Sequence, residues 1–305
     1  MRKRNSLIEL YRFIFAINVV KSHGLFPYMG PYFGPGRISV EFFFVLTGYL
    51  LMKSINKFLD KPFWEGFKGF FTSKLKAIWI PLVIAIPFNI FYCIVIKQYF
   101  VNIWGYLWYV KQMLIYIAVC FVMRYFIKNE KKFILLVESV FVVAAVLHVF
   151  PLFYSWGVIR ALMGISLGIL ISYIPKLNLK KKGLVWVILV PVQALILAIL
   201  IFGNNLLMEE VLDLILYPAL IYFTFQLTIN NKVFNYLGSL SFGLYAFQCV
   251  VRPFDKLGFN NVWILFGIIV LLSVLEDGFK RYMRYRKMEK LKTVEGGLVW
   301  KNIDC

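Results

Sequence analysis

The chain has 305 residues, of which 61% are hydrophobic and only 16% are charged. Apolar runs of 18 or more residues recur along its whole length, which is the pattern of transmembrane helices and excludes an ordinary soluble two-domain protein. The net charge of +19 would also suit a nucleic-acid-binding protein, but the basic residues gather between the apolar runs, as they do in cytoplasmic loops. We therefore expect membrane lipids, and no nucleic acid, among the partners.

Ten segments are long enough to cross a bilayer, at about 7–27, 37–54, 77–96, 104–126, 133–150, 157–175, 184–202, 210–229, 233–252 and 260–279. With the N-terminus inside, the inner segments hold 26 lysines and arginines and the outer loops hold four. This asymmetry predicts an N-in, C-in topology. We expect an all-α polytopic protein of about ten transmembrane helices in the cell membrane. Residues 1–280 would form one transmembrane domain, and residues 281–305 a short basic cytoplasmic tail.

The first two spans carry three ionisable residues, Arg12, His23 and Glu41. Each costs roughly 2.5–3.5 kcal/mol at membrane depth, so a chain that keeps them there is expected to use them. Arg12 and His23 are eleven residues apart and leave the same face of a helix, about 16 Å apart along its axis. The spacing suits a long ligand with an anionic head near the cytosol and a reactive tip deeper in the membrane.

Histidine takes and returns a proton near neutral pH, as a base for a hydroxyl nucleophile must. Glu41 begins the second span at the level of His23, where its carboxylate is expected to orient or stabilise the imidazole. We predict that His23 and Glu41 are catalytic and that Arg12 binds the anionic ligand. Spacing alone leaves a structural role open, with Glu41 and Arg12 as ion-pair partners. For the second histidine, His148, we expect an interfacial or packing role.

The longest inner segment, 56–76, mixes lysines with aromatic residues, which is the composition of a helix lying in the membrane interface. Its lysines, Lys74 and Lys76 among them, would contact lipid headgroups and attract an anionic cytosolic cofactor.

Other polar residues within the spans are weaker candidates for binding the acceptor substrate. Lys111 is expected inside the bundle, and Arg160 at the outer end of its span. Gly164 and Gly168 are expected to let another helix approach closely. The four cysteines show no metal-ligand spacing, so no metal is expected. The face formed at i, i+4 and i+7 by Ser241, Tyr245 and Gln248 is expected to line a cavity.

The chain resembles the integral-membrane acyltransferases of the acyltransferase-3 type. Their first helix carries an arginine, ten residues, and then a histidine, as Arg12 and His23 do here. LIELYR is similar to the family's L-D-x-L-R opening, and VEFFFVLTGY to its V-D-L-F-F-V-L-S-G signature, with Glu41 for the aspartate. SKLKAIWIP, LWYVKQMLIY and LGSLSFGLYAFQ resemble three later segments, and Trp108 lies in the second of them. Gln248 replaces the family's late histidine, which leaves His23 as the expected base.

The resemblance implies an O-acyltransferase that moves an acyl group, usually acetyl from acetyl-CoA, to a cell-surface or cell-wall carbohydrate. Acyl-CoA would be a co-substrate from the cytosol, and no cofactor would be permanently bound. Ser39, Thr47 and Trp108 are candidates to donate to the developing oxyanion. Direct transfer and an acyl-histidine intermediate both remain open. The alternative function is a polysaccharide or lipid-linked glycan transporter or polymerase without acyltransferase activity.

Overall fold

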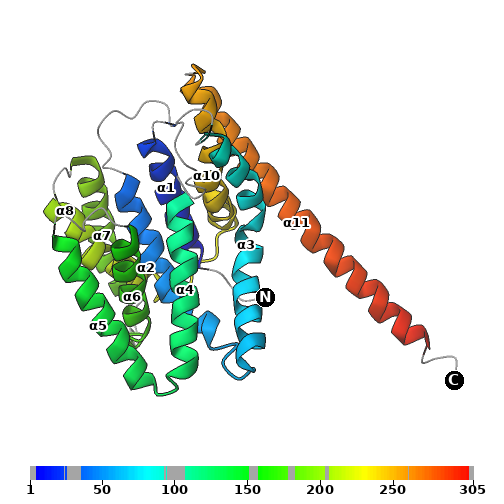
Figure 1. Cartoon of the computed structure of the whole chain (residues 1–305), viewed down its shortest axis with the longest axis horizontal. Helices are drawn as coiled ribbons and strands as arrows, with labels where there is room; N and C mark the ends of the chain where they lie inside the picture. The colour runs from blue at the N-terminus through cyan, green and yellow to red at the C-terminus, as the bar shows by residue number, and fades with distance from the viewer. Residues whose placement is uncertain are drawn as a thin grey trace.

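The computed structural model is an all-α bundle (Figure 1), and it describes residues 5–23, 25, 36–92, 94, 107–150, 157–177, 183–202, 206–259 and 261–301. The helices are α1 (Ser6–Ser22), α2 (Gly36–Ile55), α3 (Phe63–Phe91), α4 (Trp108–Phe126), α5 (Glu130–Val149), α6 (Gly157–Ser172), α7 (Gly183–Phe202), α8 (Leu206–Val211), the π-helix η3 (Leu212–Leu216), α9 (Tyr217–Thr224), α10 (Lys232–Lys256) and α11 (Val262–Lys301). The Pro/Gly connection between the first two spans lies largely outside the described residues.

Asparagine side chains fix where several helices begin. Asn5 accepts a hydrogen bond from the Leu7 amide at 3.1 Å, and Asn129 accepts one from the Lys132 amide at 3.2 Å. Asn231 and Asn261 do the same at the starts of α10 and α11. Each bond satisfies one of the backbone N–H groups that the first turn of a helix leaves without a partner. Local sequence therefore determines these starting points.

Within the described residues, each of the ten expected spans contains helix, but several boundaries differ from the prediction. Segment 56–76 is not a separate interfacial helix, because α3 begins at Phe63 and continues without a break into the third span. The last span likewise continues as α11 through residue 280 to Lys301, and Figure 1 shows this helix leaving the bundle at an angle. The eighth span is divided among α8, η3 and α9.

The outer surface of the bundle is apolar. Among the described residues, five helices are long and apolar enough to cross a membrane, namely α3, α4, α5, α7 and the first part of α11. On α5 and α7, large hydrophobic side chains such as Val143, Val146, Val187 and Leu197 are exposed. Such a surface suits lipid rather than water, as expected of a multi-pass membrane protein. The count of ten crossings stays a prediction.

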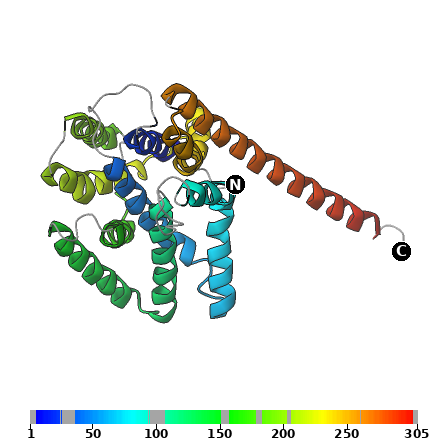
Figure 2. The same cartoon turned by 45° about the horizontal axis from the view of Figure 1, so that its top comes forward.

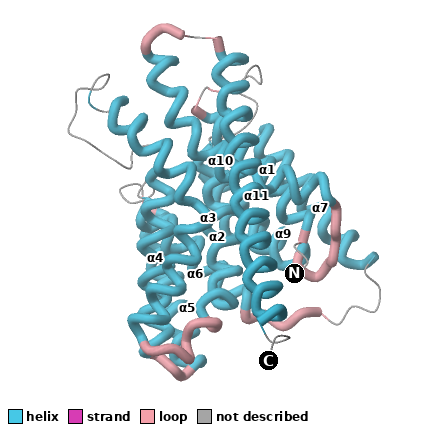
Figure 3. Tube along the Cα trace, turned by 90° about the vertical axis from the view of Figure 1, so that its right-hand side faces the viewer, coloured by secondary structure: helices cyan, strands magenta, loops and turns pink. Residues whose placement is uncertain are grey.

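The segments that the charge pattern places in the cytoplasm meet at one end of the bundle. The Ser6 amide donates to the Ile229 carbonyl at 3.0 Å, and the Tyr125 hydroxyl donates to the Lys61 carbonyl at 3.3 Å. On α11, Lys280 donates to the Ala77 carbonyl of α3 at 2.8 Å. Figures 1 and 3 show the start of α1 and the far end of α11 toward this same end. The N-in, C-in prediction requires this arrangement, and we call this end the inner end.

Glycines bring α2 and α6 into direct backbone contact. A Cβ atom at Gly48 would lie 2.9 Å from the carbonyl carbon of Ile165, and one at Gly168 would lie 2.8 Å from the Tyr49 nitrogen. Gly164, one turn before Gly168, similarly admits Phe44 of α2. The expected close approach at Gly164 and Gly168 is confirmed, and α2 is the partner. This contact positions the residues of α2 and α6 that face each other further along the pair.

A glycine also sets the spacing of α10 and α11, and a matched pair of substitutions tests it. A Cβ at Gly243 would lie 3.1 Å from the Ser273 Cα, whereas at Gly267 of α11 nothing lies within 4 Å. We expect Gly243→Ala to lower the free energy of unfolding by about 1–3 kcal/mol, the usual cost of overpacking. Gly267→Ala should leave stability unchanged or raise it slightly. Denaturant unfolding in detergent measures both, and equal effects would contradict the packing described here.

Candidate active site

Arg12 lies near the middle of α1, and His23 lies at its C-terminal end. The Arg12 guanidinium pairs with Glu9 one turn earlier, with 2.9 Å between Nη1 and Oε2, and its side chain stays 31% exposed. His23 caps the C-terminal end, because the helix finishes at Ser22 rather than at the expected residue 27. The helix therefore holds a cationic side chain toward the inner end and an imidazole at the outer end.

Helix α10 lies beside α1 (Figure 2), and two contacts show that it runs in the same direction. Near the inner end, a Cβ at Gly238 would lie 2.7 Å from the Glu9 Cα, so the two helices touch there. At the outer end, the Arg252 guanidinium donates to the His23 carbonyl oxygen at 2.5 Å. Each pair is 229 positions apart in the chain, so the helices keep one register along their whole contact.

This register sets the levels of the predicted face of α10 against α1. Ser241 lies level with Arg12, and Gln248 lies level with Val19, between Arg12 and His23. Successive residues of a helix are about 100° apart around its axis. Around the axis of α10, the contact residues Gly238 and Arg252 and the three predicted residues fall within an arc of about 80°. All three predicted residues, Ser241, Tyr245 and Gln248, are buried.

A tyrosine that the sequence analysis did not single out lies opposite Tyr245. The Tyr109 ring of α4 meets the Tyr245 ring edge-on, with centroids 5.6 Å apart. The Tyr109 hydroxyl lies 3.5 Å from Thr47 Oγ1, and Arg12 interacts with it electrostatically. The sequence offered one signal for Tyr109, because this residue directly follows Trp108 in the LWYVKQMLIY segment. Together, Arg12, Thr47, Tyr109, Tyr245 and Gln248 form a line of polar side chains along α1, which we call the α1 polar line.

Glu41 has a different partner from the expected one. Its Oε1 atom pairs with Nε of Arg160 on α6, and both side chains are buried. The Arg160 guanidinium also lies over the Trp108 ring, 5.0 Å from its centroid, a cation–π contact. Three predicted residues, Glu41, Arg160 and Trp108, are thus brought together, while an orienting contact from Glu41 to His23 stays a prediction.

The surroundings of Glu41 include further buried acids that the sequence analysis missed. His148 of α5 pairs through Nδ1 with Glu210 Oε1 at 2.7 Å, a contact that the sequence did not predict. Asp213 of η3 interacts electrostatically with Glu41 and Arg160, and its exposed fraction is 5%. The sequence signal for Asp213 was the presence of an acidic residue inside the eighth apolar span. We call Glu41, His148, Arg160, Glu210 and Asp213 the outer charge cluster.

Phe44 of α2 packs against Tyr109 of the α1 polar line and against Trp108, which lies beside the outer charge cluster. Its ring centroid lies 4.8 Å from that of Tyr109 and 6.1 Å from that of Trp108. Phe44 is fully buried. The two polar groups therefore share helix α2, and the Phe44 ring contacts an aromatic side chain next to each of them.

Of the candidate oxyanion donors, Ser39 and Thr47 already have partners within the bundle. The Ser39 hydroxyl accepts a hydrogen bond from Asn18 Nδ2 at 2.7 Å, and Thr47 lies beside Tyr109 as described. A hydroxyl both donates and accepts, so each side chain keeps hydrogen-bonding capacity for a further partner.

The predicted lysines lie apart from both groups. Lys74 of α3 is half-buried with its ammonium 5.4 Å from the centroid of the Phe70 ring, and Lys76 is exposed. Both belong to the inner part of α3, where an anionic head from the cytosol would arrive. Lys111 is exposed on α4, so its expected place inside the bundle is wrong.

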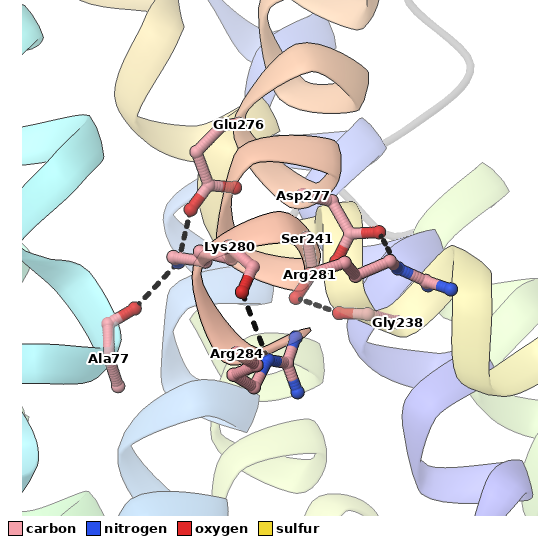
Figure 4. A network of polar contacts seen from close by, with 8 residues as sticks. All are labelled: Ala77, Gly238, Ser241, Glu276, Asp277, Lys280, Arg281 and Arg284. Atoms are coloured by element: carbon pink, nitrogen blue, oxygen red, sulfur yellow. Dashed lines mark hydrogen bonds and ion pairs between the residues drawn. The ribbon is translucent and has the colours of Figure 1, made fainter. Parts of the chain in front are cut away.

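Helix α11 adds polar contacts beside the inner part of α3 (Figure 4). Lys280 joins Glu276 of its own helix to the Ala77 carbonyl, and Arg281 Nε pairs with Asp277 Oδ2 at 2.6 Å. Arg284 Nε donates to the Lys280 carbonyl at 3.2 Å. Ser241 donates to the Gly238 carbonyl at 2.8 Å in the same view. Lys280 of α11 thus lies next to the segment that carries Lys74 and Lys76.

Comparison with known proteins supplies the family. Residues 5–275 match the acyltransferase domain of the acyltransferase-3 family. Searches of curated proteins and of solved structures give no match. The match covers α1 to α10 and much of the apolar part of α11, and so includes every residue of the α1 polar line and of the outer charge cluster. The chain therefore belongs to the acyltransferase-3 family, and the protein is a multi-pass membrane acyltransferase.

Proposed function

We propose that the protein moves an acetyl group from acetyl-CoA to a hydroxyl of a cell-surface or cell-wall carbohydrate. The observation that carries the proposal is the arrangement along α1, with Arg12 toward the inner end, His23 at the outer end, and the α1 polar line between them. A CoA thioester has the matching chemistry, with phosphates at one end and a reactive acyl group at the other. The proposed site is the cell membrane, and the partners are acyl-CoA, the carbohydrate acceptor and lipids.

In the proposed reaction, His23 is the general base. The imidazole takes the proton of the sugar hydroxyl while the oxygen attacks the thioester carbonyl carbon. The carbon–sulfur bond then breaks, and the CoA thiolate takes the proton back from the imidazolium. An ester and free CoA are formed, with no net change in protons.

The other predicted residues bind the two substrates. Arg12, Lys74 and Lys76 hold the anionic head of the donor, because cationic side chains form strong charge-assisted hydrogen bonds with phosphates. Glu41, held by Arg160, supports the imidazolium electrostatically. The residues proposed to contact the acceptor or the transferred group are Trp108, Arg160, Ser241 and Tyr245.

Labelled acetyl-CoA tests this function. Inside-out vesicles that contain the protein should move acetyl label from external acetyl-CoA into the glycan fraction, and mild base should release it, as expected of an ester. Label in the adenine ring of the same donor should not enter the glycan. Vesicles from cells that lack the protein give the background. If succinyl-CoA but not acetyl-CoA labels the glycan, the acetyl assignment is wrong. If no acyl-CoA does so, the proposed function fails.

A further inference from the structure

Gln248 is a buried amide whose hydrogen-bonding groups have no partner in the described part of the chain. Its exposed fraction is 1%, and neither Nε2 nor Oε1 makes a hydrogen bond there. Such a group carries a substantial free-energy cost, because the donors and the acceptor lose water and gain nothing in return. The asparagines that cap α1 and α5 show the usual alternative, in which the side-chain amide bonds to the backbone.

The position of Gln248 relates this unpaired amide to the proposed donor path. In the register of α1 and α10, Gln248 lies about 10 Å beyond the level of Arg12 and about 6 Å before that of His23, at 1.5 Å per residue. Around the axis of α10, the directions of Gln248 and Arg252 differ by about 40°, and Arg252 contacts α1 directly. A molecule that extends from Arg12 to His23 would therefore pass Gln248.

Hydrophobic residues form part of the surroundings of Gln248. Val19, which lies level with it on α1, belongs to the same buried cluster as Ala246 and Cys249. A sugar ring would bring several hydroxyls into this region, and each would need its own partner. A flexible ligand in which single amides are joined by methylene groups needs only one polar partner at each amide.

We propose that Gln248 binds an amide of the pantetheine arm of acyl-CoA, an inference that rests on the proposed function. A side-chain amide offers both N–H donors and a carbonyl acceptor, so it can form two hydrogen bonds with another amide at once. Binding the arm satisfies the buried groups of Gln248 and fixes how far the thioester reaches along α1 toward His23. Gln248 is thus a specificity residue for the donor. The histidine that the family carries at this position would instead supply a titratable group.

Two variants and two ligands test the proposal. Gln248→Met keeps the length of the side chain and removes the amide. Gln226→Met is the matched control, because the Gln226 amide already donates to the Tyr222 carbonyl at 3.2 Å. The ligands are CoA and adenosine 3′,5′-bisphosphate, which carries the phosphorylated adenosine but lacks the arm. Affinity for purified protein is measured for each combination, together with thermal unfolding without ligand.

Gln248→Met should weaken CoA binding about tenfold, the usual effect of losing two neutral hydrogen bonds, and should leave binding of the bisphosphate unchanged. Thermal stability without ligand should stay equal or rise, because an unpaired buried amide is removed. Gln226→Met should change neither affinity. A purely structural role for Gln248 would instead lower stability and weaken both ligands alike.

Three results would overturn the proposal. They are unchanged CoA binding by Gln248→Met, equal weakening of CoA and the bisphosphate, and a change confined to the KM of the acceptor. If wild-type protein transfers acetyl to glycan and Gln248→Met binds CoA normally, only the role of Gln248 fails. If wild-type protein neither binds CoA nor labels glycan, the proposed function fails along with it.

Discussion

Replacing His23 with alanine is expected to lower the rate of acetyl transfer by about 10²- to 10⁴-fold, the usual contribution of a positioned general base. Arg12, Lys74 and Lys76 remain in place in this variant, so the KM for acetyl-CoA should change little while kcat falls. His23 is half-buried and follows the last residue of α1, so the substitution should leave the fold intact. Initial rates with labelled acetyl-CoA in vesicles of equal protein content measure the effect.

His148→Gln is the matched control for His23→Ala, since it changes the chain's other histidine. A glutamine at position 148 can still hydrogen-bond Glu210, whose Oε1 lies 2.7 Å from the imidazole. We expect this variant to keep most of its activity. Equal rates for wild type and His23→Ala would show that the base is another residue, while the acyltransferase class would stand.

Breaking the buried pair of Glu41 and Arg160 is expected to cost the largest amount of stability. In Arg160→Met, the carboxylate of Glu41 stays almost fully buried without its partner. Removing one member of a buried pair typically destabilises a protein by about 3–5 kcal/mol, because the other charge is left uncompensated. Denaturant unfolding in detergent should show this loss for Arg160→Met.

A double-mutant cycle separates the interaction between Glu41 and Arg160 from the effect of each residue alone. In Glu41→Met/Arg160→Met both charges are gone, and apolar side chains often replace a buried pair with little loss of stability. We expect the double variant to recover most of the stability lost by Arg160→Met, without recovering activity if Glu41 supports His23. A double variant as unstable as the sum of the single ones would contradict coupling between the two residues.

The sequence predicted the helices well because long apolar runs and capping asparagines are local signals. It failed for segment 56–76, since lysines mixed with aromatic residues suit both an interfacial helix and the first turns of a longer one. The partner of Glu41 was not predictable either. It depends on how closely α6 approaches α2, and this is set by Gly48 and Gly168, which lie more than a hundred residues apart. The level of Gln248 against α1 is likewise a property of helix packing, which no local pattern records.

The glycine contact between α2 and α6 also bears on how the bundle can open. With backbone against backbone at Gly48 and Gly168, neither helix can slide along the other without losing contact, so the two should move as one rigid body. Arg160 and Glu41 would then travel together when a substrate enters or a product leaves. Helix α3 is built differently, because Pro81 and Pro87 lie inside it and each removes a main-chain hydrogen bond. We therefore expect α2 and α6 to be the stiffer part of the bundle and α3 to bend more easily, on the side where a donor from the cytosol would enter.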